Sequence, residues 1–142
     1  MTLASDAAAA VDALGAAFLS GDPDTVLEHF ASTGDVIYAG SEPGEVAIGK
    51  HAIRSLLQAL FTRTERYSWR TTALSAGGTP DTLYLVADAD LFVHPAAPGP
   101  PAGPPTQQLP YRISGVLERE DDGWRWRLCH GSEPTPSDAP ES

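Results

Sequence analysis

The chain has 142 residues, of which 42% are hydrophobic and 20% charged, so it is long enough for one globular domain with a sizeable core. Its net charge of −10 argues against nucleic acids and anionic membrane surfaces as partners, because both present phosphate groups. No apolar run approaches the roughly 20 residues that cross a bilayer. The N-terminus lacks a basic region and contains Asp6 and Asp12, which indicates a helix instead of a signal peptide. With Cys129 as the only cysteine, we expect a cytoplasmic protein without a disulfide within the chain.

Three helices are predicted in the first half of the chain. The first covers residues 6–20 and ends at Gly21. A short second helix follows Asp22 and Pro23, a typical N-cap followed by proline in the first turn. The third lies within residues 49–64, where the apolar spacing is clearly helical: Ile53, Leu56, Leu57, Leu60 and Phe61.

Strands dominate the rest of the chain. Residues 35–40 predict a short strand before the third helix, and residues 45–49 add a second short one. Four longer strands follow the third helix, over residues 66–76, 82–94, 111–120 and 124–132. Helices first and strands later indicate an α+β fold. We expect a curved antiparallel sheet that wraps around the three N-terminal helices as a cone, open at one end.

Residues 94–110 stand apart because they are rich in proline, which cannot donate a hydrogen bond to a sheet. We interpret them as a solvated loop, with a lid or a dimer-contacting arm as the alternative. A proline-rich docking motif is disfavoured, since no basic residue flanks it. The predicted organisation is therefore a single domain over residues 1–132 and a disordered tail over residues 133–142.

Two segments carry a resemblance to a known family. The first, AAFLSGDPDTVLEHF through GKHAIRSLLQAL, has a Gly-Asp break, a strand, an acidic turn and a third helix in the family's order. The second, YRISGVLEREDDGWRWRLCHGSEP, resembles its closing hairpin. Together they resemble the SnoaL-like family of the nuclear-transport-factor-2-like superfamily. The resemblance implies a pocket between sheet and helices, chemistry like that of polyketide cyclases and isomerases, and a homodimer paired through the open sheet face. Because this fold hosts many different activities, the resemblance does not identify a particular reaction.

The strand at 82–94 alternates strictly, and the two faces lead to different hypotheses. If Asp88 and Asp90 face the pocket, the apolar environment would raise the pKa of a carboxyl group there. Such a group is a candidate general base that takes a proton from the carbon beside a carbonyl. If the leucine and alanine face forms the core instead, the two aspartates lie on the outside. The first alternative makes Asp88 and Asp90 catalytic candidates.

The last strand raises a similar question at His130, which alternation places on the face of the tryptophans: Trp124, Trp126, Leu128, His130 and Ser132. A neutral imidazole at the pocket rim could move protons near pH 7. Antiparallel pairing brings Arg112 and Ser114 beside His130, where an arginine would orient an anionic oxygen. We therefore take His130 as a third catalytic candidate, with Arg112, Ser114 and Trp126 as substrate-binding candidates.

Tyr38 and Trp69 complete the substrate-binding candidates, as a hydroxyl donor and a flat apolar wall. Four histidines without ligand spacing predict no metal, and the lack of nucleotide-binding motifs predicts no cofactor. One hypothesis is a cofactor-independent enzyme that isomerises, cyclises or dehydrates a hydrophobic ring-containing metabolite. The other is a module that binds a small molecule or dimerises without catalysis.

Overall fold

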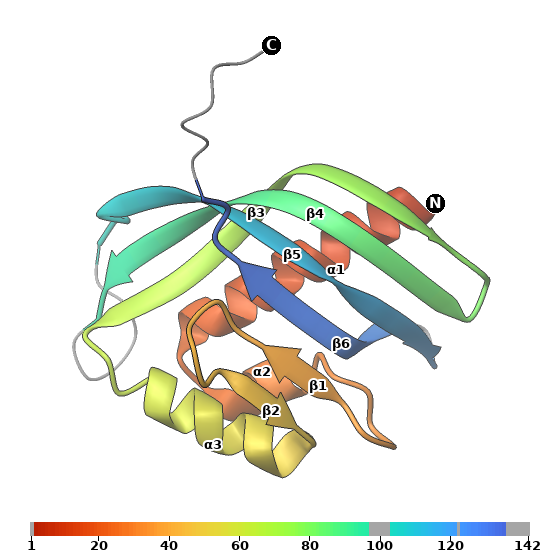
Figure 1. Ribbon diagram of the computed structural model, residues 1–142, viewed down its shortest axis with the longest axis horizontal. Coiled ribbons are helices and arrows are strands. Elements are labelled where there is room, and N and C mark those ends of the chain that lie inside the picture. Colours follow the sequence, from red (N-terminus) through yellow and green to blue (C-terminus); the bar gives the residue numbers. More distant parts are fainter. Residues whose placement is uncertain (1, 97–102, 122, 136–142) are drawn as a thin grey trace.

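The computed structural model describes residues 2–96, 103–121 and 123–135. Its elements in chain order are α1 (Leu3–Ser20), α2 (Pro23–Leu27), β1 (Ile37–Ala39), β2 (Val46–Ile48), α3 (Lys50–Leu60), β3 (Glu65–Gly78), β4 (Thr82–Pro95), β5 (Gln107–Glu120) and β6 (Gly123–Ser132). Figure 1 shows α1 along one face of the long strands, with α2 and α3 beside β1 and β2. The predicted α+β fold with a curved sheet and three helices is confirmed.

The described residues form one six-stranded sheet in the order β2-β1-β6-β5-β4-β3. β1 pairs with β6 in parallel, whereas every other neighbouring pair is antiparallel. The last strand thus returns to the first part of the chain, and Tyr38 on β1 lies in register with Cys129 on β6. This return brings β1 to the same end of the sheet as the start of β5.

Local capping sets the ends of the first two helices. α1 begins at Leu3, earlier than predicted, because Thr2 and Ser5 form a reciprocal capping box. It ends as expected at Gly21, whose φ of 71° is a left-handed conformation that favours glycine. Asp22 caps α2 by accepting from the Asp24 amide at 3.1 Å, followed by Pro23 in the first turn.

The long strands extend beyond their predicted ends. β4 continues to Pro95 and β5 starts at Gln107, with Val93 paired to Gln107. The predicted proline-rich loop at 94–110 was therefore too long, because its two flanks are strand. Its middle, residues 97–102, lies outside the described residues, as does 136–142 of the predicted tail.

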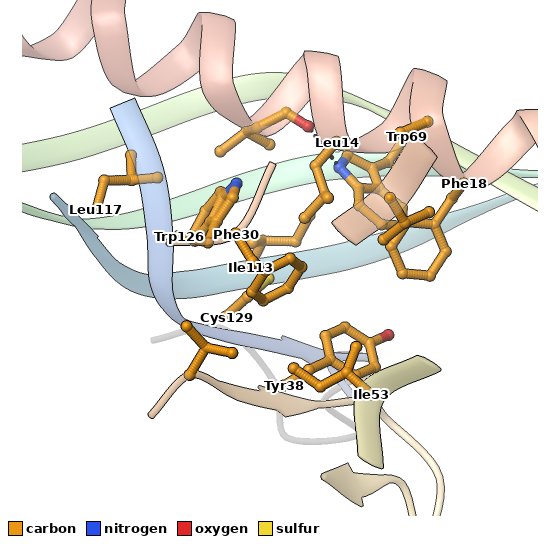
Figure 2. Close-up of a cluster of buried hydrophobic side chains, with 14 of the residues drawn as sticks. Leu14, Phe18, Phe30, Tyr38, Ile53, Trp69, Ile113, Leu117, Trp126 and Cys129 are labelled. Carbon is orange, nitrogen blue, oxygen red and sulfur yellow. Dashed lines mark hydrogen bonds between the residues drawn. The ribbon is translucent and has the colours of Figure 1, made fainter. Parts of the chain in front are cut away.

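The core lies between α1 and the inner surface of the sheet. Gly15 allows the close approach, because an added Cβ would lie 2.7 Å from the Trp69 carbonyl oxygen. The Trp69 indole Nε1 donates to the Val11 carbonyl at 2.7 Å, which joins β3 to α1 (Figure 2). By length and hydropathy (1.3), α1 is apolar enough to cross a membrane. The burial of Val11, Leu14 and Phe18 in this core gives its composition a structural reason.

Candidate functional site

A cavity of about 490 Å³, its open mouth included, lies where the C-terminal ends of α1 and α3 meet the sheet. Five aromatic residues, five charged or hydroxyl-bearing residues near the mouth and two leucines line it: Phe18, Tyr38, Tyr67, Trp69, Tyr111, Ser41, Glu42, Glu45, Arg63, Glu133, Leu60 and Leu91. The cavity thus combines an aromatic wall with a charged rim.

The aromatic wall is continuous from one side of the cavity to the other. Phe18 on α1 lies 4.8 Å from Trp69 and 5.8 Å from Tyr38, measured between ring centroids. Tyr111 on β5 stacks against Trp69 at 5.9 Å. Because the Trp69 nitrogen is already bonded to Val11, the indole presents a flat apolar surface to a ligand.

Two of the three tyrosines that line the cavity are buried. Tyr38 is 6% exposed and Tyr111 is 7% exposed. No described residue hydrogen-bonds the Tyr38 hydroxyl, and Figure 2 shows it pointing away from Trp126 and Leu117. The ring is buried in the core, while the hydroxyl oxygen is not among the fully enclosed polar atoms of the described residues. This hydroxyl is therefore available to a ligand in the cavity.

Both phenols stay protonated well beyond neutral pH. Burial raises the pKa of Tyr38 most, and the neighbouring Tyr111, Cys129 and Glu45 raise it further. Burial also raises the pKa of Tyr111, outweighing a hydrogen bond with Ser41. Gly131 on β6 makes room for the Tyr111 hydroxyl, because a Cβ at that position would collide with it. The cavity thus holds two neutral, largely buried tyrosines in addition to the half-buried Tyr67.

Charged residues at the mouth come from two loops that converge. Arg63, after α3, forms an ion pair with Glu42, between β1 and β2, with Nη2 and Oε2 2.8 Å apart. This hydrogen bond lowers the pKa of the Glu42 carboxyl. The Glu42 amide in turn donates to Glu45 Oε1 at 3.0 Å, which orients the half-buried Glu45 carboxylate. The charge of Glu45 acts on both Tyr38 and Tyr111.

The structure places two of the predicted substrate-binding residues, Tyr38 and Trp69, in the cavity lining. Their role in binding stays a prediction. Trp126 does not line the cavity: it is 1% exposed and belongs to the buried core with Phe30 and Ile113 (Figure 2). Its predicted contact with substrate is therefore not supported by its position, because the core surrounds it.

Asp88 and Asp90 lie outside the cavity, so the alternative that made them catalytic candidates is wrong and the alternative with an apolar inner face is the one the structure has. The inner face of β4 is the leucine and alanine face, where Leu83, Leu85 and Ala87 are at most 3% exposed. Asp88 points outward and forms an exposed ion pair with Arg112, Oδ1 to Nε 2.9 Å. Packing against α1 selects the apolar face, because burying an unpaired carboxylate there would cost far more.

His130, Ser114 and Arg112 also lie away from the cavity. The predicted pairing is present, with Ser114 opposite His130 and Arg112 opposite Ser132. The face is the outer one, because a β-bulge at Arg127 inserts one residue into β6 between Trp126 and Leu128. After the bulge, Cys129 and Gly131 are buried while His130 is exposed. Simple alternation from the tryptophans therefore placed His130 on the wrong face.

Sequence reasoning missed most of the cavity's polar groups. Tyr111 could have been found from its spacing with the buried Ile113 and Leu117, which share its face. Glu45, Glu42 and Arg63 lie in loops, where no periodicity predicts their direction. Cys129 is buried beside the tyrosines, and burial raises the pKa of its thiol, so it is a poor nucleophile. Within the described part of the chain, no three His, Cys, Asp or Glu side chains group as metal ligands do.

A profile of SnoaL-like domains matches residues 7–136, nearly the whole described chain. The protein belongs to the SnoaL-like family. No curated protein matches this SnoaL-like chain in sequence. Solved structures share its fold, with coverage given first for this chain and then for the other. A nuclear transport factor 2-like protein from Salmonella enterica has a TM-score of 0.72 at 14% identity, covering 99% and 96%.

Two further structures with the fold of this SnoaL-like protein carry enzyme descriptions. A proposed dehydratase of the nuclear transport factor 2-like family from Streptomyces avermitilis has a TM-score of 0.69 at 20% identity, covering 94% and 96%. A proposed scytalone dehydratase from Novosphingobium aromaticivorans has a TM-score of 0.72 at 11% identity, covering 97% and 88%. At these identities the likeness establishes the fold alone.

Proposed function

We propose that the cavity binds a small, hydrophobic, ring-containing metabolite and moves a proton on it without a cofactor. The observation that carries this proposal is Tyr38, a largely buried residue that lines the cavity and whose hydroxyl has no partner among the described residues. A ring that lies against Phe18 and Trp69 would place its own oxygen within reach of this hydroxyl.

The polar groups of the cavity suit acid–base chemistry next to a carbonyl. Glu45 would take a proton from the carbon beside the carbonyl, and Tyr38 or Tyr111 would donate a hydrogen bond to the oxygen as it gains negative charge. Isomerisation, cyclisation and dehydration all begin with such a step. Two structures of the same fold are described as dehydratases, which supports this class of reaction.

Proton transfer can be tested directly with cyclic ketones in D2O. We expect the protein to speed exchange of the hydrogens beside the carbonyl, measured by NMR, and Glu45→Gln to abolish the acceleration. Tyr38→Phe should lower affinity about 5- to 10-fold, as expected for the loss of one buried hydrogen bond. If the wild-type protein speeds hydrogen exchange in none of the ketones that it binds, the proposed proton transfer is wrong.

Binding without turnover is the second candidate function, and two observations favour it. No histidine lines the cavity among the described residues, and Glu45 already accepts a hydrogen bond from the Glu42 amide. Thermal shift separates binding from chemistry, because a ligand at 100 times its Kd adds about 2.7 kcal/mol to stability. A raised Tm without proton exchange would support a binding module, and no shift with any ring compound would overturn both candidates.

We also propose a homodimer that pairs through the outer face of the long strands. Tyr84 and Val86 support it, because they are 60% and 49% exposed on neighbouring outward positions of β4. Light scattering after size exclusion should give twice the chain mass of 15.0 kDa, and Val86→Glu should return a monomer. A wild-type monomer at micromolar concentration would contradict the pairing.

A further inference from the structure

The rim of the cavity carries more negative charge than it can neutralise. Three carboxylates line it, from Glu42, Glu45 and Glu133, against a single guanidinium from Arg63. Arg63 is already paired with Glu42. Within the described residues, neither Glu45 nor Glu133 takes part in an ion pair. Two carboxylates therefore face the cavity with no cation beside them.

The single guanidinium at the mouth is not free to receive an acidic ligand. Both of its terminal nitrogens contact Glu42, at 2.8 and 3.3 Å. A ligand carboxylate would have to replace Glu42 at this position and would also meet the repulsion of Glu45 and Glu133. Like charges at such short range disfavour binding, because the partly buried site screens them less than water does.

Aromatic rings line the same cavity as these carboxylates. Phe18 and Tyr111 each contact Trp69. The faces of aromatic rings attract cations, and tryptophan does so most strongly. A positive group in the cavity would be attracted both by these ring faces and by Glu45. The Tyr38 hydroxyl offers an oxygen that accepts a hydrogen bond from an ammonium N–H.

We propose that the ligand of this cavity is an organic cation, an amine attached to an apolar ring. The proposal rests on the proposed function, in that it assigns a charge to the ring compound that the cavity binds. Glu45 neutralises the ammonium group, Glu133 attracts it at the mouth, and the aromatic wall holds the ring. The net charge of −10 on the whole chain also draws cations toward the protein.

Three naphthalene compounds that differ in one group test this assignment: 2-naphthylmethylamine, 2-naphthalenemethanol and 2-naphthoate. Isothermal titration calorimetry at low salt should give an affinity for the amine at least 10-fold above that for the alcohol, with the carboxylate weakest. Raising the salt concentration to about 0.5 M should reduce this preference several-fold, because the screening length then falls below 10 Å.

Variants that replace one carboxylate with a neutral amide show which carboxylate causes the preference for the amine. Glu45→Gln should weaken amine binding about 10-fold and change alcohol binding less than twofold. Glu28→Gln is the matched control, because Glu28 is exposed on the surface beside α2 and does not line the cavity. If Glu45→Gln fails to fold, Glu133→Gln takes its place, since Glu133 is exposed after β6 and should reduce amine binding two- to fivefold.

The outcomes separate this inference from the proposed function. Equal or tighter binding of the alcohol or the carboxylate would overturn the cation assignment and leave the ring-binding cavity in place. An amine preference that survives in Glu45→Gln and Glu133→Gln would also overturn it. If none of the three compounds binds at millimolar concentration, the ring-binding function fails, and the cation assignment fails with it.

Discussion

The inner and outer surfaces of the same strands carry different kinds of polar group. On β5, Tyr111 faces the cavity and is 7% exposed, whereas the adjacent Arg112 lies outside and pairs with Asp88. The exposed ion pair adds about 0–1 kcal/mol to stability. Tyr38 on the inner surface is 6% exposed, lines the cavity and has a hydroxyl without a partner among the described residues. The comparison teaches that an unpartnered polar group inside a cavity points to function more reliably than exposed ion pairs do.

The largest difference between the two surfaces should appear in core packing on β4. Leu85 is 3% exposed and faces α1, while the next residue, Val86, is 49% exposed. Leu85→Ala should lower the free energy of unfolding by about 2–5 kcal/mol. Val86→Ala should change it by less than about 0.5 kcal/mol in the monomer. Urea denaturation measures both. If Val86→Ala lowered the free energy of unfolding of the monomer by more than about 1 kcal/mol, Val86 would have to be buried and not exposed on the outer surface.

Gly131→Ala should disturb the cavity from the neighbouring strand. The new methyl group would collide with the Tyr111 hydroxyl, so either the ring or β6 must shift. We expect a loss of about 1–3 kcal/mol in the free energy of unfolding. The same substitution in a Tyr111→Phe background should cost clearly less, because the colliding oxygen is gone. Equal costs in the two backgrounds would contradict this contact.

Alkaline pH should destabilise the inner surface through its tyrosines. Their pKa values are raised in the folded protein, so the unfolded chain loses its phenolic protons first, from about pH 10. Stability should therefore be complete below pH 10 and fall above it, by up to about 1.4 kcal/mol per pH unit for each phenol. Tyr38→Phe should flatten this dependence in denaturation curves recorded from pH 9 to 11.5. An unchanged slope would mean that Tyr38 is accessible to solvent.

The smallest effects belong to the outer surface. Asp88→Ala breaks an ion pair in which both side chains are about half exposed, so it should cost less than about 1 kcal/mol. His130→Ala removes an exposed side chain and should change stability by no more than about 0.5 kcal/mol. Neither should change the affinity for ring compounds more than twofold in calorimetry. A tenfold loss with His130→Ala would place the ligand on the outer surface after all.

Regular periodicity made much of the fold predictable. The apolar periodicity over residues 6–20 predicted α1, and its apolar residues Val11, Leu14 and Phe18 are buried. Strict alternation over residues 82–94 defined the two faces of β4, although both directions remained open. The candidate site was less predictable. Tyr38 and Trp69 line the cavity, whereas Asp88, Asp90 and His130 do not.

The sequence by itself determined the order of the elements, the α+β class and the two faces of each regular strand, because these follow from local periodicity and capping. Tertiary structure decided which face became the inner one, since only packing against α1 distinguishes them. It also decided the direction of His130, because the bulge at Arg127 depends on pairing with β5. The positions of Glu42, Glu45 and Arg63 depended most on tertiary structure, because these residues lie in loops without periodicity and the Arg63–Glu42 ion pair joins two loops that are distant in sequence.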